Sequence, residues 1–257
     1  MSQDAMPQDK EYMATLAKGL AVLGSFDKHR PIMTLSQAAQ ATGLSRATAR
    51  RILRTLAQLG YVVQNGREFS LSSGILKLGF AYLATQNWIE QAAPQMRQLS
   101  EQFQESCSAA ILEGTEIVYV ARFPARRIMS VTLAVGTRLP AFHTSLGRIQ
   151  LGFLDHAEFW RRLMALRIEA YTPSTITDLQ ALYERVQEDH VQGFSIVDEE
   201  LERGLRSIAV PVVDRSGQAI AALNVSTHST RTTRNELRER FLPNLRTVAQ
   251  QISASVA

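Results

Sequence analysis

Four arginines are spaced so that they share one side of a helix. Within residues 45–56 they are Arg46, Arg50, Arg51 and Arg54. At 3.6 residues per turn, the opposite side of that helix is apolar and suited to a core. Guanidinium groups bind phosphates and guanine edges, so the arginine face has the chemistry of DNA binding. The alternative is a solvated, arginine-rich helix in an ordinary helical domain.

The residues before this helix predict how it is positioned. Thr34 and Gln37 have the spacing of a capping box, which begins a first helix. Gly43 stands where a tight turn needs the left-handed conformation, and glycine adopts that conformation at little cost. Ser45 can then cap the arginine helix. Together these residues predict a helix-turn-helix.

The flanking sequence completes a small domain. An apolar helical stripe follows Thr15, a candidate cap, and predicts one more helix upstream. Asn65 and Gly66, between two short apolar runs, predict a β-hairpin. We therefore expect a winged helix-turn-helix over residues 12–73. Arg67, beside the hairpin tip, can contact the DNA backbone or minor groove; alternatively, the hairpin only closes the small core.

The charge of the chain is concentrated in this segment. Residues 12–73 hold eight Lys and Arg against two acidic side chains, a net charge of +6. Residues 74–257 hold 19 basic and 19 acidic side chains, and residues 1–11 carry −2. A basic module joined to a neutral body is typical of a nucleic-acid-binding protein with a separate second activity.

The remaining composition narrows the class of protein. Residues 1–11 are polar and acidic, resemble neither a signal nor a transit peptide, and are expected to form a disordered lead-in. No apolar run is long enough to cross a bilayer. The single cysteine, Cys107, suits a reducing compartment. We expect a cytoplasmic protein with no membrane partner.

Signals for catalysis are weak. Cys107 and His143 could form a nucleophile and base, but no third group or motif supports them. The five histidines lack metal-ligand spacing, and no phosphate-binding glycine loop occurs. We therefore expect no catalytic residue, no metal and no cofactor.

Beyond the hairpin the pattern changes twice. Residues 74–88 are helical and too apolar for a flexible linker, so we expect a linker helix that pairs with another subunit or packs on its own C-terminal domain. Residues 89–257 mix strands and helices, which predicts an α+β domain around one antiparallel sheet. Strands are expected at residues 108–112, 117–123, 130–133, 207–213 and 219–226, and helices at 92–105, 145–152, 157–166, 178–190 and 235–255.

One loop of this domain could hold an anion. It runs from Gly136 through Pro140 into a helix that starts near Thr144 or Ser145. Helix N-termini attract carboxylates and phosphates, and Arg148 in the first turn could clamp such an anion. Alternatively, Thr144 or Ser145 only caps its helix and Arg148 faces water.

Two further places could contact a ligand. The acidic and basic residues from Asp198 to Ser207 either orient a ligand or form surface ion pairs. Asn224 and Ser226 alternate with apolar neighbours on a strand, so they can face an inner cavity together. Arg122, at the end of another strand, is a candidate partner for a carboxylate.

Several blocks of sequence, in order, resemble one family. They are LSQAAQATGLSRATARRILRTLAQLGYV, FSLSSGILKLGFAYL, GTRLPAFHTSLGR, VDEELERGLRSIAVPV and AALNVS. From about residue 12 to the end, the chain resembles the isocitrate-lyase-regulator (IclR) family of bacterial transcription factors. The resemblance implies a winged helix-turn-helix, a linker helix and a GAF-like effector domain, assembled as a homodimer or a dimer of dimers. Within the family, the chain is similar to Pca/Pob-type regulators, which respond to aromatic acids or β-ketoadipate.

The resemblance also implies roles for particular residues. Ser45, Arg46, Thr48, Arg50 and Arg51 would contact the operator. The effector would lie near Asp198 to Ser207, near the strand with Asn224, and near Thr144, Ser145, Leu146, Gly147 and Arg148. Many relatives have a cysteine where this chain has His143, so the effector of this chain can differ from theirs.

The leading hypothesis is therefore a transcription factor that binds promoter DNA as a dimer and senses a small carboxylate. As an activator it would also contact RNA polymerase. One alternative is a ligand-independent DNA-binding repressor whose C-terminal domain only oligomerises. The other is an enzyme that acts on the same metabolites.

Overall fold

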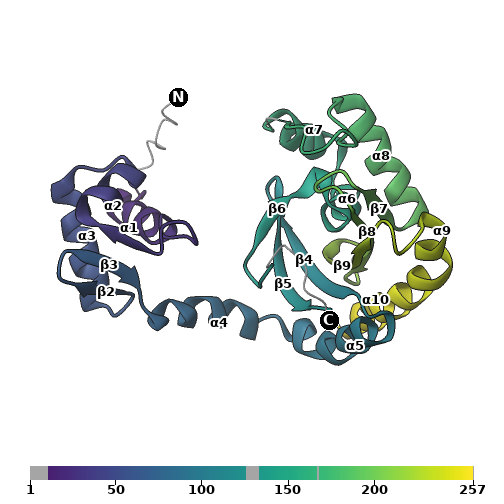
Figure 1. The fold of residues 1–257 in the computed structure, drawn as a ribbon, viewed down its shortest axis with the longest axis horizontal. Helices are drawn as coiled ribbons and strands as arrows, with labels where there is room; N and C mark the ends of the chain where they lie inside the picture. The colour runs from purple at the N-terminus through teal and green to yellow at the C-terminus, as the bar shows by residue number, and fades with distance from the viewer. Residues whose placement is uncertain (1–10, 126–132, 167, 257) are drawn as a thin grey trace. The chain divides into compact units, whose positions relative to one another are not determined.

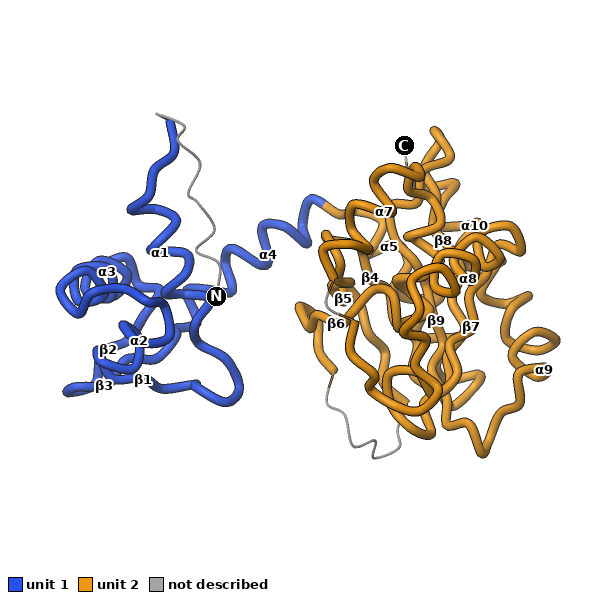
Figure 2. Tube along the Cα trace, turned by 90° about the horizontal axis from the view of Figure 1, so that it is seen from above, with its two compact units in different colours: residues 1–85 blue, residues 86–257 orange. Residues whose placement is uncertain are grey.

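The computed structural model describes residues 11–125, 133–166 and 168–256. The chain divides into two compact units, residues 1–85 and 86–257 (Figure 2). Residues 1–10 of the expected lead-in and residues 130–132 of one expected strand lie outside the described residues.

The N-terminal unit is a winged helix-turn-helix (Figure 1). Its helices are α1 (Ala14–Gly24), α2 (Leu35–Thr42) and α3 (Arg46–Gln58). Thr34 and Gln37 form the predicted capping box, and Gly43 ends α2 with a φ of 66°. The side chain of Ser45 accepts a hydrogen bond from the backbone N–H of Thr48 and caps α3. These local predictions are confirmed.

The hairpin of this unit has a third strand that we did not predict. The strands β2 (Val62–Asn65) and β3 (Glu68–Leu71) form the expected wing, and β1 (Ile32–Thr34) pairs with β3 on its other side. A three-residue strand is too short to give a periodic signal.

The predicted cap at Thr15 is wrong: α1 begins at Ala14, so Thr15 lies inside the helix and no side chain caps it.

The linker helix is shorter than expected. After a 3₁₀ turn (Ser73–Ile75), α4 runs from Leu76 to Ala84, and α5 (Asn87–Phe103) begins the second unit. The hydroxyl of Thr85 donates to the carbonyl of Tyr82, 2.7 Å away, which competes with continued helix. Trp88, expected at the end of the linker, is instead buried in the first turn of α5.

The C-terminal unit is built on a six-stranded antiparallel sheet of order β6-β5-β4-β9-β8-β7. This confirms the predicted α+β class. The sequence did not predict β6 or β7. The strands are β4 (Ser106–Glu113), β5 (Glu116–Phe123), β6 (Arg138–Pro140), β7 (Ser195–Asp198), β8 (Leu205–Val213) and β9 (Ala219–His228).

Helices cover both faces of this sheet. One face carries α6 (Ser145–Leu151), and α7 (His156–Met164) and α8 (Leu179–Gln192) pack on the same core cluster. The other face carries α5 and the C-terminal helix α10 (Leu242–Ser255), which pack on each other and on the central strands. A short helix α9 (Arg234–Glu236) and a π-turn (Leu237–Phe241) precede α10.

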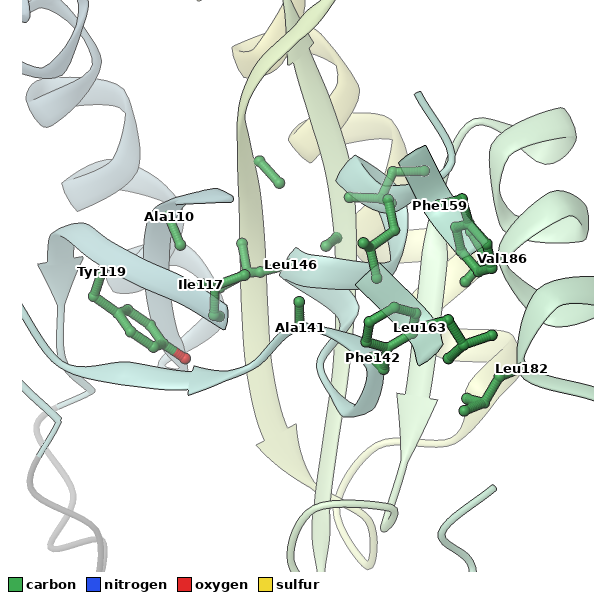
Figure 3. Close-up of a cluster of buried hydrophobic side chains, with 14 residues drawn as sticks. Ala110, Ile117, Tyr119, Ala141, Phe142, Leu146, Phe159, Leu163, Leu182 and Val186 are labelled. Atoms are coloured by element: carbon green, nitrogen blue, oxygen red, sulfur yellow. The ribbon is translucent and has the colours of Figure 1, made fainter. Parts of the chain in front are cut away.

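Small side chains bring α6 close to the sheet. Ala110, Ala209 and Ala222 lie under it in one buried cluster with Leu146, and Figure 3 shows side chains of the sheet meeting those of α6, α7 and α8. Gly147 allows a second close approach: a Cβ there would lie 2.2 Å from the carbonyl oxygen of Ala141. The backbone of the turn before α6 therefore requires glycine at this position.

We predict that Gly147→Ala destabilises the C-terminal unit by about 1–3 kcal/mol or more, because the backbone must shift to admit the methyl group. Thermal unfolding followed by circular dichroism would measure this. Gly19→Ala in α1 is the control: a Cβ there meets nothing within 4 Å, and alanine favours helix. An unchanged unfolding temperature for Gly147→Ala would contradict the close approach.

Candidate functional site

The arginine face of α3 is free to bind an external anion. Arg46, Arg50 and Arg54 are exposed and recur every four residues along the helix, so they form one ridge. None of the three has an ion-pair partner within the described part of the chain. Because no carboxylate in residues 11–85 neutralises the ridge, its positive charge is available to phosphates.

Other predicted DNA contacts lie around this ridge. Arg51 and Thr48 line a hollow together with Leu16 and Leu20 of α1, so these two residues of α3 lie on the side of the helix that is turned toward α1. The hydroxyl of Thr48 lies 2.9 Å from the hydroxyl of Ser45 at the helix start. Arg67 is exposed in the turn between β2 and β3.

A cavity of about 260 Å³ lies in the C-terminal unit, over β5, β4, β9 and β8. It brings together six of the predicted ligand residues: Arg122, Thr144, Ser145, Ser207, Asn224 and Ser226. Apolar side chains complete the wall, among them Leu133, Leu139, Val197, Leu201 and Leu205. The volume is just below the range of about 300–1,000 Å³ that is usual for small-molecule sites.

The strand register explains why polar side chains gather there. Ser108 of β4 lies opposite Arg122 of β5 and Asn224 of β9. Two residues further along, and therefore on the same face, Ser226 lies opposite Ser106 and Ser207. Two polar rows thus run across the sheet at the cavity. Ala209, opposite Asn224, lies at the end of the first row, and the pair Ala110 and Ala222 continues the same face under α6.

Arg122 brings a positive charge to the cavity wall. Its guanidinium donates to the hydroxyl of Ser108 at 3.2 Å and lies 3.5 Å from that of Ser106. Burial lowers the pKa of this guanidinium from its usual value. No carboxylate pairs with it among the described residues. The next residue, Phe123, lies against α5, where the guanidinium of Arg97 is 5.0 Å from its ring centre.

Arg148 does not line the cavity, contrary to the predicted clamp. It is fully buried, and its two terminal nitrogens bind both carboxylate oxygens of Glu200. Its Nε donates to the carbonyl of Phe142 at 2.8 Å. All its strong donors are therefore directed at protein groups, and Arg148 positions the turn before α6. Glu200 lies 52 residues away, so local sequence could not reveal this partner.

Three more predicted ligand residues lie outside the cavity wall. Asp198 forms ion pairs with Arg206 and Arg234, which agrees with the alternative of structural ion pairs. Leu146 and Gly147 are buried in α6. Thr144 caps α6 through the N–H of Gly147 and also borders the cavity, so both interpretations of this residue hold.

The cavity wall includes His143, the residue of the predicted ligand loop that stands where many relatives have a cysteine. His143 is 1% exposed, and neither ring nitrogen has a hydrogen-bond partner in the described structure. Burial lowers its pKa to about 4; the charge of Arg148 adds to this shift, and Glu200 opposes it. The Oδ1 atom of Asn224 is also buried without a partner. Buried polar atoms are normally paired, so the cavity wall offers unused hydrogen-bonding capacity.

The cysteine and histidine considered as a catalytic pair do not share this site. Cys107 alternates with Ser106 and Ser108 on β4, so it points to the opposite face of the sheet. Burial raises the pKa of its thiol to about 12, which suppresses the reactive thiolate. Among the described residues, no three His, Cys, Asp or Glu side chains gather as metal ligands.

No helix in the described ranges is long and apolar enough to span a membrane.

Two family models match the chain. The IclR helix-turn-helix domain matches residues 15–66, and the bacterial transcriptional regulator IclR C-terminal domain matches residues 80–254. The two matches correspond to the winged domain and to the unit that contains the cavity.

Known proteins resemble the chain over nearly its whole length. The Pca regulon regulatory protein of Pseudomonas putida is 44% identical over 94% of this chain and 83% of its own. A solved transcriptional regulator from Rhodococcus sp. RHA1 is 42% identical, covers 95% of this chain and 98% of its own, and has a TM-score of 0.84.

A third relative was solved with a ligand. It is a double mutant of the PobR inducer-binding domain from Acinetobacter, in complex with 3-hydroxybenzoic acid. It is 30% identical, with a TM-score of 0.60 over 64% of this chain and 97% of its own. The order of domains, the matching family models and these relatives lead to one conclusion: the chain belongs to the IclR family of bacterial transcriptional regulators.

Proposed function

We propose that this regulator binds promoter DNA as a homodimer and responds to a small carboxylate, either an aromatic acid or a dicarboxylate from ring cleavage. Protocatechuate, 4-hydroxybenzoate and β-ketoadipate are the candidate types. The observation that carries the proposal is Arg122, a guanidinium on the cavity wall that has no carboxylate partner among the described residues. The names of the Pca relative and the ligand of the PobR domain support it.

A small carboxylate ligand would complement the cavity wall in two ways. It would neutralise Arg122, whose present partners are serine hydroxyls, through charge-assisted hydrogen bonds. Its apolar body would lie against leucine and valine side chains of the wall. The unpaired atoms of His143 and Asn224 would bind the remaining polar groups.

The dimer would join two N-terminal units. Helices α1 and α4, and the residue that precedes α1, expose apolar side chains: Met13, Leu16, Leu20, Leu76, Leu78 and Phe80. Monomeric soluble proteins seldom expose large apolar patches, and winged domains of this size usually bind two half-sites. A second copy of the chain is therefore the proposed occupant of this face. The effector would favour one arrangement of the two DNA-binding units by a shift in population.

Two alternatives remain distinguishable by experiment. A ligand-independent repressor would bind no aromatic or dicarboxylic acid in a thermal-shift screen. An enzyme would turn these acids over, whereas we propose that the purified protein leaves them unchanged. We also propose that the protein acts in the cytoplasm, where promoter DNA lies. An activator would in addition recruit RNA polymerase in an in vitro transcription assay.

We predict that Arg50→Ala weakens operator binding about ten-fold, because it removes a phosphate or base contact of about 1–3 kcal/mol. Footprinting on DNA upstream of the encoding gene would measure the effect. Arg215→Ala removes the same charge from an exposed turn of the C-terminal unit and should leave protection unchanged. Full protection by the Arg50 variant would exclude this residue from the interface.

We predict that Arg122→Gln weakens carboxylate binding about ten-fold or more, since hydrogen bonds to charged groups contribute about 1.5–3 kcal/mol. Calorimetry with 4-hydroxybenzoate and with β-ketoadipate would test this, with Arg215→Gln as control. Equal affinity in the Arg122 variant and the wild type would show that the carboxylate binds elsewhere.

We predict that Phe80→Glu dissociates the dimer, because a carboxylate at an apolar interface must lose its hydration. Sedimentation velocity would report the change in mass. Lys77→Glu introduces the same side chain on α4 at a position that is already charged and exposed, and it should preserve the dimer. A dimeric Phe80 variant would argue against this face.

A further inference from the structure

Helix α3 presents one small apolar side chain among its exposed arginines. Ala47 lies in the first turn of the helix, between Arg46 and Thr48, and it is exposed. Thr48 is half-buried, and its hydroxyl lies 2.9 Å from the hydroxyl of Ser45. The side chain of Ala47 has no polar atom, so it can contribute to a DNA interface through its methyl group alone.

The helical positions show that Ala47 faces directly away from the core of the N-terminal unit. Four residues of α3 are buried: Ala49, Ile52, Leu53 and Leu56. Successive residues of an α-helix are rotated by about 100°, so the mean direction of these four lies about 170° from that of Ala47. On the same basis, Arg50 lies about 60° to one side of Ala47 and Arg51 about 40° to the other. Ala47 therefore lies in the middle of the exposed side, near the start of the helix.

A small side chain at this place has a defined consequence in the major groove. A recognition helix contacts base edges with the residues of its N-terminal part, and the residue that points away from the core approaches the bases most closely. Alanine keeps the helix backbone near the bases, but its side chain can form no hydrogen bond with them. The base edges in the major groove carry one apolar group, the C5-methyl of thymine.

This inference rests on the proposed binding of promoter DNA by a homodimer. We propose that Ala47 contacts the C5-methyl group of a thymine in each half-site, so that the regulator prefers thymine at that position. Burial of the two methyl groups against each other favours the contact. A cytosine at the same position would present an amino donor in place of the methyl group. Alanine offers no acceptor to that donor, and a polar group that loses its hydration without a new partner is unfavourable.

Replacement of thymine by uracil tests the contact, because uracil lacks only the C5-methyl group. Each thymine of the DNA site protected in footprinting is replaced in turn, and the dissociation constant of the full-length protein is measured by fluorescence anisotropy at fixed salt. We expect affinity to fall about four-fold at one thymine of each half-site, which is the ratio that a buried methyl-sized group supplies. A protein that binds every uracil duplex as tightly as the unmodified duplex would overturn the inference.

A pair of variants shows whether Ala47 makes the contact. Ala47→Gly removes the methyl group of the protein, so the affinity ratio of the thymine duplex to the uracil duplex should fall close to one. Ala41→Gly is the matched control: it removes a methyl group from an exposed position of α2, at a similar cost in helix stability, and should preserve the ratio. A ratio that stays near four in Ala47→Gly would assign the contact to another residue and overturn the inference.

Ala47→Ser replaces the glycine variant if that variant binds too weakly to measure. Its hydroxyl would lie against the thymine methyl, so the ratio should again fall, and an unchanged ratio would count against the contact. If the wild type protects no promoter DNA, the proposed function itself fails and this inference falls with it. Protected DNA without any thymine that is sensitive to uracil overturns the methyl contact alone and leaves promoter binding intact.

Discussion

The buried pair of Arg148 and Glu200 is the interaction on which the effector unit depends. It joins α6, the 3₁₀ turn before it and the loop after β7, because Arg148 also binds the carbonyl of Phe142. The hydroxyls of Thr172 and Thr175 donate to the backbone carbonyls of residues 199 and 200 and fix the loop from its other side. Removing one partner of such a pair leaves a buried charge, at a cost of about 3–5 kcal/mol. The pair therefore holds two walls of the cavity together while adding no net charge to it.

Because Glu200 neutralises the charge of Arg148, the charge of Arg122 on the cavity wall is the important one for an anion. Among the described residues, Arg122 lies on the cavity wall and Arg148 lies behind it, and of these two Arg122 is the one without a carboxylate partner. Because Arg148 is paired with Glu200, Arg122 is the one of these two arginines that is available to an anion. Serine hydroxyls hold the Arg122 side chain in place without cancelling its charge, so the cavity has a defined cationic end before any ligand arrives.

Sequence reasoning succeeded where the determining contacts are local. The capping box of Thr34, the turn at Gly43 and the cap at Ser45 each involve residues a few positions apart, and all are present. Alternation on β9 correctly placed Asn224 and Ser226 together. It failed for Arg148, whose partner is 52 residues distant, and for the surroundings of His143, which three separate segments create. The limits of α4 also escaped prediction, because a hydrogen bond from the Thr85 hydroxyl competes with the helix there.

The end of β5 has a structural consequence for the sheet. Arg122 and Phe123 are consecutive, one facing the cavity and the other facing α5. A single peptide bond thus joins the residue whose guanidinium lies on the cavity wall to the residue whose aromatic ring contacts α5. At this point one strand separates the cavity from the face of the sheet that α5 covers.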